Sequence, residues 1–381
     1  MFLKSVFGAD QPFFADFNTL VDHLGPAIGP LIVAAVVAAA LTPAAIGLSR
    51  RFGMMAVPDG VRHRHLRPTP LLGGAVLAAA FTVGVIVFHR PDLLVLSLIF
   101  LGVMTAVLFM TDDRAPLPPL AKFGLQLLVS LFAVVVFGET FRITYFFVPY
   151  VGQVHIGLLA VPLTLVWLLG MQNTVNLLDG VDGLAAGVVA IVALVLAVAA
   201  AGRGQPDVVL FSGALAGACL GFLLFNFHPA RIFMGDSGAH FLGLILGLLS
   251  VVGVAKVAVA FALVVPVLAL AIPIGDTAWA IVRRRRRRVS IAHPDTRHIH
   301  HQLLDFGLTP LETCLLFYCG TGILGAVALM LFGHRRILLA AVVLFTVAIL
   351  TVVGARLQVV RVRWRVPGAG RLLSDRTAPS R

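Results

Sequence analysis

The chain has 381 residues, of which 59% are hydrophobic and only 12% are charged. Soluble domains are about 45–50% apolar and about 25% charged, so this composition excludes a soluble protein held by a single anchor. The formal net charge of +12 would suggest nucleic-acid binding in a soluble protein. In a polytopic membrane protein it first indicates orientation, and nucleic acid is not expected as a partner.

Apolar runs recur along almost the whole chain, and a run of about 20 residues can span a bilayer as a helix. Breaks at proline, glycine and charge clusters separate these runs. The predicted spans, in chain order, are 27–49, 70–88, 93–111, 120–138, 157–175, 184–201, 208–227, 238–254, 257–282, 314–332 and 337–355. The expected fold class is therefore an all-α polytopic membrane protein with about 11 transmembrane helices. The aromatic and β-branched segment 141–156 predicts a small hairpin in an external loop.

Lysine and arginine are distributed unevenly between the two sides that these spans define. If the loop after the first helix is cytoplasmic, 22 of the 29 Lys and Arg residues lie on the cytoplasmic side. The positive-inside rule then predicts an external N-terminus and a cytoplasmic C-terminus. The six consecutive arginines at 283–288 fit this topological role, together with contact to anionic lipids.

The chain accordingly divides into three parts. Residues 1–26 are the expected external N-terminal segment, 27–355 a single transmembrane domain, and 356–381 a basic cytoplasmic tail. A cleaved signal peptide is not expected, because the first 26 residues lack a positively charged start. The three cysteines lie inside apolar runs and are expected to be small core residues, not disulfides or metal ligands.

Five predicted cytoplasmic loops carry polar residues to one membrane face: 50–69, 112–122, 173–183, 226–238 and 283–313. Most carboxylates lie at these loops, and the positive-inside rule gives no reason for that. Ionisable groups at membrane depth are costly and are by default functional. This layout predicts one composite active site built from loops that are distant in sequence.

Asp112 and Asp113 lie at the end of a predicted helix and suit a metal, a proton or a basic partner; a solvated helix end paired with Arg114 is the alternative. Lys122 follows nine residues after Asp113. It is the only lysine on the predicted cytoplasmic side, although a lysine that merely reaches the membrane interface would explain it too.

The segment from Asn173 to Leu184 is the most informative. Its Asn and Asp residues recur every three positions, which places them on one side of a helical turn; they are Asn173, Asn176, Asp179 and Asp182. The glycines within the segment allow positive φ and close approach of a ligand. Hard oxygen ligands with amides suit Mg²⁺ and a phosphorylated substrate, and no EF-hand loop follows.

Three further stretches carry polar groups. Asp236 precedes a predicted helix, whose N-terminus and nearby amides could also meet an anion; an N-cap aspartate is the alternative. Phe233 nearby either stacks on a planar base or packs. The segment 295–304 offers Arg297 and three histidines as phosphate donors; zinc at its histidines and a solvated basic loop are the alternatives. The loop 58–74 is basic and ends in a glycine pair, and orientation alone explains much of its charge.

Together these motifs resemble the polyprenyl-phosphate N-acetylhexosamine-1-phosphate transferase superfamily. The resemblance runs from about Pro58 to Thr309 and rests on N-x-x-N-x-x-D-G-x-D-G-L, F-x-G-D-x-G and D-x-x-H-x-H-H. The sequence is most similar to the branch that moves GlcNAc-1-phosphate from UDP-GlcNAc to a polyprenyl phosphate. Eleven spans and the His-Ile-His-His segment fit that branch, whereas the UDP-MurNAc-pentapeptide branch usually has ten spans and three consecutive histidines.

The resemblance implies a role for each matching residue. Asp236 would bind Mg²⁺, with Asn176 as a second ligand and Mn²⁺ as a substitute metal. The implied catalytic residues are Asp112, Asp113, Asp179 and Asp182. The implied substrate-binding residues are Arg64, Thr69, Lys122, Asn176, Asn226, Phe233, Arg297, His298, His300 and His301. The residue match at Arg64 and Thr69 is loose, and Asp276 resembles a family position whose role has no physical account.

The implied reaction is attack of a lipid phosphate oxygen on the β-phosphorus of a UDP-sugar, with UMP leaving, at the cytoplasmic face of a bacterial inner membrane. Another UDP-N-acetylhexosamine, either UDP-GalNAc or UDP-MurNAc-pentapeptide, is the main alternative donor. A proton-coupled transporter is a remote alternative, because the helix centres are nearly free of charge. The glycan pathway, the lipid length, a phospho-aspartyl step and a homodimer stay open.

Overall fold

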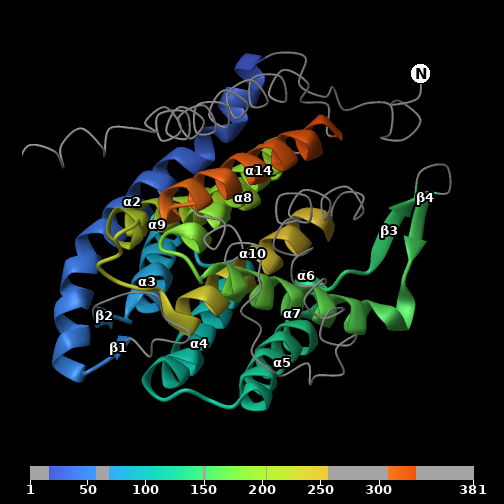
Figure 1. Cartoon of the computed structure of the whole chain (residues 1–381). Helices are drawn as coiled ribbons and strands as arrows, with labels where there is room; N and C mark the ends of the chain where they lie inside the picture. The colour runs from blue at the N-terminus through green and yellow to red at the C-terminus, as the bar shows by residue number, and fades with distance from the viewer. Residues whose placement is uncertain (1–16, 57–67, 149–151, 203, 256–307, 332–381) are drawn as a thin grey trace, which may run out of the picture.

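The computed structural model describes residues 17–56, 68–148, 152–202, 204–255 and 308–331 (Figure 1). Its elements, in chain order, are α2 (Phe17–Phe52), β1 (Met55–Ala56), β2 (Thr69–Pro70), α3 (Gly73–Ile86), α4 (Leu93–Arg114), α5 (Pro119–Val136), α6 (Gly138–Phe141), β3 (Tyr145–Val148), β4 (Gly152–His155), the 3₁₀ turn η1 (Gly157–Leu159), α7 (Ala160–Leu178), α8 (Leu184–Ala201), α9 (Pro206–Asn226), α10 (Gly235–Ala255) and α14 (Pro310–Leu331).

Within these residues, seven helices are long and apolar enough to cross a membrane: α2, α4, α5, α7, α8, α9 and α10. This confirms a polytopic helical membrane protein. The 14-residue α3 and the helix α14 occupy the predicted spans 70–88 and 314–332. The predicted spans 257–282 and 337–355, the tail 356–381 and residues 1–16 lie outside the described part, so eleven spans and the sides of the termini stay predictions.

Two small antiparallel pairs of strands interrupt the helical pattern. In β1–β2, Met55 pairs with Pro70, and this pair closes the base of the predicted first basic loop. In β3–β4, Tyr145 pairs with His155, which confirms the hairpin predicted for 141–156. Figure 1 shows this hairpin projecting from the side of the bundle opposite α2.

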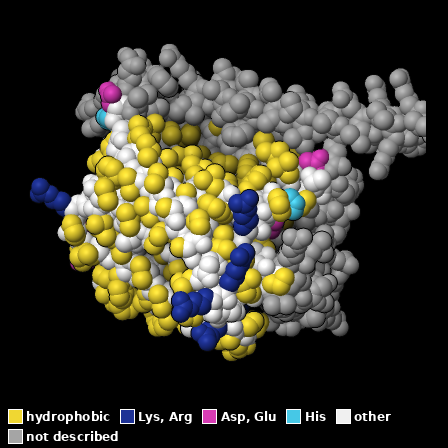
Figure 2. Space-filling view, turned by 90° about the vertical axis from the view of Figure 1, so that its left-hand side faces the viewer, with side chains coloured by type: hydrophobic (Ala, Val, Ile, Leu, Met, Phe, Trp, Pro, Cys, Tyr) yellow, Lys and Arg dark blue, Asp and Glu magenta, His cyan; other side chains and the backbone are white. Residues whose placement is uncertain are grey.

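The outer helices turn large apolar side chains outward, as a lipid-facing surface requires. Val36 of α2, Val107 of α4 and Val135 of α5 are each more than half exposed, while α8 is almost wholly buried. The face in Figure 2 is mostly covered by hydrophobic side chains, and Lys and Arg gather in a few places. An aqueous surface of this composition would be unusual, so the outer face is suited to a bilayer.

The helices α2 and α9 pack with their backbones unusually close. Gly213, Gly217 and Gly221 line one face of α9, and a Cβ added at any of them would meet the backbone of α2. Small residues at this spacing allow close approach of transmembrane helices. The helix α2 begins at Phe17, ten residues before the predicted start at 27, and it continues through Pro26 and Pro30, since membrane helices tolerate proline.

Two further boundaries differ from the prediction in ways that matter for the site. The helix α7 continues to Leu178, three residues beyond the predicted span 157–175, so Asn176 as well as Asn173 lies in its last turns. Asp112 and Asp113 likewise belong to the last turn of α4. In both cases the polar side chains contact residues of neighbouring helices, and the helix continues through them.

Candidate active site

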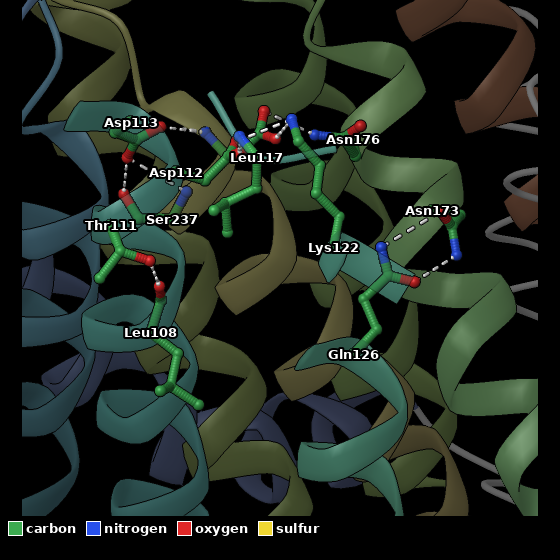
Figure 3. Close-up of polar contacts among 11 residues, drawn as sticks. Leu108, Thr111, Asp112, Asp113, Leu117, Lys122, Gln126, Asn173, Asn176 and Ser237 are labelled. Atoms are coloured by element: carbon green, nitrogen blue, oxygen red, sulfur yellow. Dashed lines mark hydrogen bonds and ion pairs between the residues drawn. The ribbon is translucent and has the colours of Figure 1, made fainter. Parts of the chain in front are cut away.

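The polar motifs meet at one end of the bundle. Because α4, α5, α7, α8, α9 and α10 alternate in direction, the end of α4 lies beside the starts of α5 and α10 and the end of α7. Figure 3 shows side chains from these helices pointing toward one another. Three of the five predicted loops and the described base of the loop 50–69 therefore share one end. Residues 57–67, and almost all of the loop 283–313, lie outside the described residues.

Lys122 is at the centre of this cluster. Its Nζ lies 2.7 Å from Oδ2 of Asp112 and 2.6 Å from Oδ2 of Asp236. The Asp112 side chain is only 4% exposed, whereas that of Lys122 is 31% exposed. Proline starts α5 three residues earlier, which places Lys122 in the first turn beside the helix ends. One ammonium thus bridges two carboxylates that are 124 residues apart in sequence.

The remaining oxygens of these two carboxylates have other partners. Oδ1 of Asp112 accepts a hydrogen bond of 2.7 Å from the backbone N–H of Leu117 and so orders the turn between α4 and α5. Oδ1 of Asp236 accepts one of 3.1 Å from the amide nitrogen of Asn176. The two Oδ2 atoms are therefore the ones that face the cation.

Asp113 has a different task from its neighbour. It accepts hydrogen bonds from the backbone N–H groups of Asp236 and Ser237, at 2.7 and 3.3 Å, and from the Ser237 hydroxyl. These donors form the N-terminus of α10, where a carboxylate is favoured. Gly235 precedes them with φ +68°, and a side chain there would meet the Asp113 carboxylate. Asp113 therefore positions Asp236 from another helix.

The turn between α7 and α8 contains Asp179 and Asp182. Burial raises the pKa of the Asp179 carboxyl well above its usual range, and the charges of Asp236, Asp113 and Asp182 raise it further. The other carboxylate, that of Asp182, lies 2.9 Å from Nδ1 of His228 and accepts a hydrogen bond of 3.0 Å from the backbone N–H of Ala230. The Asp182 side chain thus ties this turn to the loop between α9 and α10.

Helix α14 holds the same turn from the other side. The Tyr318 hydroxyl donates a hydrogen bond of 2.7 Å to the carbonyl of Gly183, and the Cys314 thiol donates one of 3.3 Å to that of Asp182. Gly183 has φ +80°, which suits glycine. All three cysteines of the chain are free and buried, as predicted.

The loop that precedes α10 is joined to the base of the first basic loop. The backbone N–H of Phe233 donates to Pro70, and that of Gly73 donates to Phe233, at 2.8 and 3.1 Å. Thr69 is buried beside them. Asn226, which is 1% exposed, donates to the carbonyl of Ile232 and so shapes this loop. The uridine contacts predicted for Phe233 and Asn226, and the substrate contact of Thr69, stay predictions.

The remaining predicted residues lie outside the described part of the chain: Arg64, Arg297, His298, His300 and His301. Sequence reasoning missed other residues of the site. Ser237 lies within F-x-G-D-x-G and His228 within the predicted loop 226–238, but neither was predicted as a site residue. Gln126 follows Lys122 by four positions and pairs with Asn173, its carbonyl oxygen accepting from Asn173 at 2.7 Å; the helical spacing could have indicated it. Tyr318 and Cys314 carried no signal, because they lie in an apolar run.

The cluster suits a hard divalent cation. Among the described residues, no three His, Cys, Asp or Glu side chains converge on one point. Two carboxylate oxygens do face one positive charge, and the Asn176 amide adjoins them. Mg²⁺ is commonly held by one or two carboxylates together with substrate phosphates, so these donors fit it.

Comparison with known proteins gives concordant matches. Residues 93–254, which include all five carboxylates described above, match glycosyl transferase family 4. A probable undecaprenyl-phosphate N-acetylglucosaminyl 1-phosphate transferase of Bacillus subtilis is 34% identical over 289 residues, covering 75% of this chain and 80% of that protein. A decaprenyl-phosphate N-acetylglucosaminephosphotransferase of Mycolicibacterium smegmatis is 33% identical over 360 residues, covering 85% and 88%.

The matches also include enzymes named for another donor. A phospho-N-acetylmuramoyl-pentapeptide-transferase of Moorella thermoacetica is 35% identical over 322 residues, covering 79% of this chain and 97% of that protein. Identity to the two kinds of relative is thus nearly equal, and identity alone does not distinguish the donors.

Proposed function

This chain belongs to glycosyl transferase family 4, and from that premise we propose that it transfers N-acetylglucosamine-1-phosphate from UDP-GlcNAc to a membrane polyprenyl phosphate, releasing UMP. The observation that carries the proposal is the convergence of Asp112, Asp236, Asn176 and Lys122 at one end of a membrane-spanning bundle. The reaction would be the first membrane step of a cell-envelope glycan pathway, at the cytoplasmic face of a bacterial inner membrane.

The chemistry requires two anions to meet at the membrane surface. A lipid phosphate oxygen would attack the β-phosphorus of UDP-GlcNAc while the bond to the UMP oxygen breaks. The lipid phosphate, with a second pKa of about 6 as in phosphate monoesters, is mostly ionised at pH 7, so a strong general base is not required. The residues would therefore act mainly by neutralising charge and fixing orientation.

Asp112 and Asp236 would hold Mg²⁺, with Asn176 beside them. When bound, Mg²⁺ supplies charge neutralisation on the diphosphate. Asp113 would keep Asp236 in place through the N-terminus of α10, and Lys122 would bind phosphate oxygens. Asp179 and Asp182 would line the site from the turn between α7 and α8. We expect EDTA to abolish transfer, with Mg²⁺ restoring it and Mn²⁺ substituting.

A screen of sugar donors tests the proposal. Purified protein, polyprenyl phosphate and Mg²⁺ are incubated with radiolabelled UDP-GlcNAc, UDP-GalNAc, UDP-glucose or UDP-MurNAc-pentapeptide, and label in the lipid is measured. We expect UDP-GlcNAc to be used and UDP-MurNAc-pentapeptide to be rejected. UDP-glucose lacks the N-acetyl group, and an unmatched buried polar group costs roughly 1–3 kcal/mol, which predicts about ten- to a hundredfold slower transfer.

The Asp236→Asn variant is the control, since it keeps the side-chain size but removes the charge, and its label should stay at background. Equal or better use of UDP-MurNAc-pentapeptide would assign the protein to the other donor while leaving phosphotransfer intact. No transfer from any donor by well-folded protein would contradict the proposed function.

A further inference from the structure

The Lys122 ammonium lies between the two carboxylate oxygens of the site that would otherwise bind a metal cation. Both Oδ2 atoms that face inward, one from Asp112 and one from Asp236, lie within 2.7 Å of Nζ. Both Oδ1 atoms are engaged elsewhere, by the N–H of Leu117 and the amide of Asn176. Figure 3 shows the Lys122 side chain extending from α5 into this position.

The neighbouring carboxylate offers no second place of the same kind. Both oxygens of Asp113 are occupied by the first residues of α10, through two backbone N–H groups and the Ser237 hydroxyl. Of the three carboxylates that α4 and α10 contribute, only Asp112 and Asp236 each present an oxygen to the same cation. We call this position between their Oδ2 atoms, which Lys122 occupies, the seat.

The Lys122 ammonium and a divalent cation are unfavourable together at this position because both are positively charged. Two carboxylates balance one divalent cation, whereas they leave one negative charge over when only an ammonium is bound. An ammonium and a divalent ion within hydrogen-bonding distance of the same two oxygens would repel each other strongly. Lysine is a compact charge on a flexible four-carbon stem, and this side chain is partly exposed, so it has room to leave.

We infer that Lys122 and the divalent cation compete for the seat between Asp112 and Asp236, so that metal binding releases the Lys122 ammonium toward the substrate phosphates. The inference rests on the proposed function only for the identity of those phosphates. By linkage, whatever weakens Lys122 in the seat strengthens metal binding, and metal binding frees Lys122 to the same degree. Lys122 thus offsets one of the two negative charges before the metal binds, and it becomes available to the substrate once the metal is bound.

The first test measures metal affinity without any substrate. Mn²⁺ is titrated into purified protein in detergent, and free Mn²⁺ is followed by electron paramagnetic resonance. We expect Lys122→Met, which keeps the stem but removes the competing charge, to bind Mn²⁺ about tenfold more tightly than the unmodified chain, within the usual range for coupled sites. Equal or weaker binding by folded Lys122→Met would overturn the inference.

Two variants separate competition from a general charge effect. Arg114→Met removes one positive charge from the exposed end of α4, outside the seat, and we expect its Mn²⁺ affinity to stay within about twofold of the unmodified chain. Adding Asp236→Asn to Lys122→Met should abolish the gain. A shared seat would be contradicted if Lys122→Met gained no more Mn²⁺ affinity than Arg114→Met. It would also be contradicted if the double variant with Asp236→Asn kept the gain.

The second test uses the unmodified chain and does not depend on a variant that folds. The chain is treated with a small amine-reactive acetylating reagent, with and without saturating Mg²⁺. Acetylation of each lysine is measured by mass spectrometry, with Lys4 and Lys256 as internal references. We expect Mg²⁺ to raise the labelling rate of Lys122 several-fold, and this rise to be absent in Asp236→Asn. An unchanged or lower rate would overturn the inference. Neither test contains a donor or lipid, so a failed transferase assay would not affect them.

Discussion

Asp112 and Asp113 are sequence neighbours with the same side chain, yet they contact different parts of the site. Asp112 faces Lys122 and the turn before α5, whereas Asp113 receives the N-terminus of α10. Successive residues of a helix point about 100° apart, so adjacent carboxylates at a helix end reach different neighbours. The pair therefore combines one group for a cation with one group that positions Asp236.

Asp179 allows a prediction about pH. Its folded pKa is raised by burial and by neighbouring carboxylates, so the native state binds a proton that the unfolded chain releases. Native stability from this group falls as pH rises from the ordinary Asp pKa of about 3.9 toward the raised value. We expect metal-free Asp179→Asn to be more heat-stable than the unmodified chain at pH 7, with the difference shrinking toward pH 4.

Thermal melts in EDTA at several pH values measure this difference. Glu139→Gln is the control, because Glu139 is an exposed carboxylate in α6, and its curve should follow that of the unmodified chain. A difference for Asp179→Asn that is constant with pH would point to packing, not ionisation.

At the scale of elements, the turn between α7 and α8 is held by two other segments. The loop before α10 reaches Asp182 through His228 and Ala230, while α14 reaches two of its carbonyls through Tyr318 and Cys314. Figure 1 shows α14 lying alongside α8, and Gly187 of α8 leaves room for the Tyr318 ring. A helix with no motif of its own thus positions a turn of the candidate site.

Removing these donors should disturb the turn. Tyr318→Phe removes one of two donors to the Gly183 carbonyl, which keeps the backbone N–H of Gly187 at 3.0 Å. The loss of this hydrogen bond costs about 1 kcal/mol of stability, and we expect transfer to slow several-fold. Cys314→Ala should act in the same direction but more weakly, because a thiol is a weak donor. Melting temperature and kcat are measured together. Cys314→Ser retains a donor and is the matched control; if it behaves like Cys314→Ala, packing and not the hydrogen bond is responsible.

At the scale of the whole molecule, alternating helix direction brings the site together at one end and puts the β3–β4 hairpin at the other. Each of α4, α7 and α9 ends at the site, and each of α5, α8 and α10 begins there. The positive-inside rule predicts that the site end is cytoplasmic. All native cysteines are buried, so single cysteines added at exposed positions can report the side without removing them.

Ala115 and His155 are exposed at opposite ends and suit this test. In intact cells, a membrane-impermeant maleimide should label His155→Cys, whereas Ala115→Cys should react only after permeabilisation. The opposite pattern would invert the topology and place the candidate site outside, away from cytoplasmic UDP-sugars.

The sequence alone determined the class of the molecule and most of the side chains at its site. Apolar run length and charge asymmetry are local properties of the chain, and they are sufficient to indicate membrane helices and the face that their loops share. Sequence motifs singled out Asp112, Asp236 and Asn176, and the scarcity of lysine singled out Lys122; all four lie in one cluster. The helix ends were less predictable: α7 ends three residues beyond its predicted span, where Asn173 and Asn176 contact side chains of α5 and α10.

Only the tertiary structure decided which side chain contacts which. Nothing in the local pattern distinguishes Asp112 from Asp113, or indicates that Tyr318 reaches a carbonyl 135 residues earlier. Such contacts depend on how helices cross and how closely they approach, which is set by packing between segments distant in sequence, such as the glycine face of α9 against α2. The position of Lys122 between two carboxylates is therefore a property of the folded bundle, since α4, α5 and α10 must meet before the seat exists.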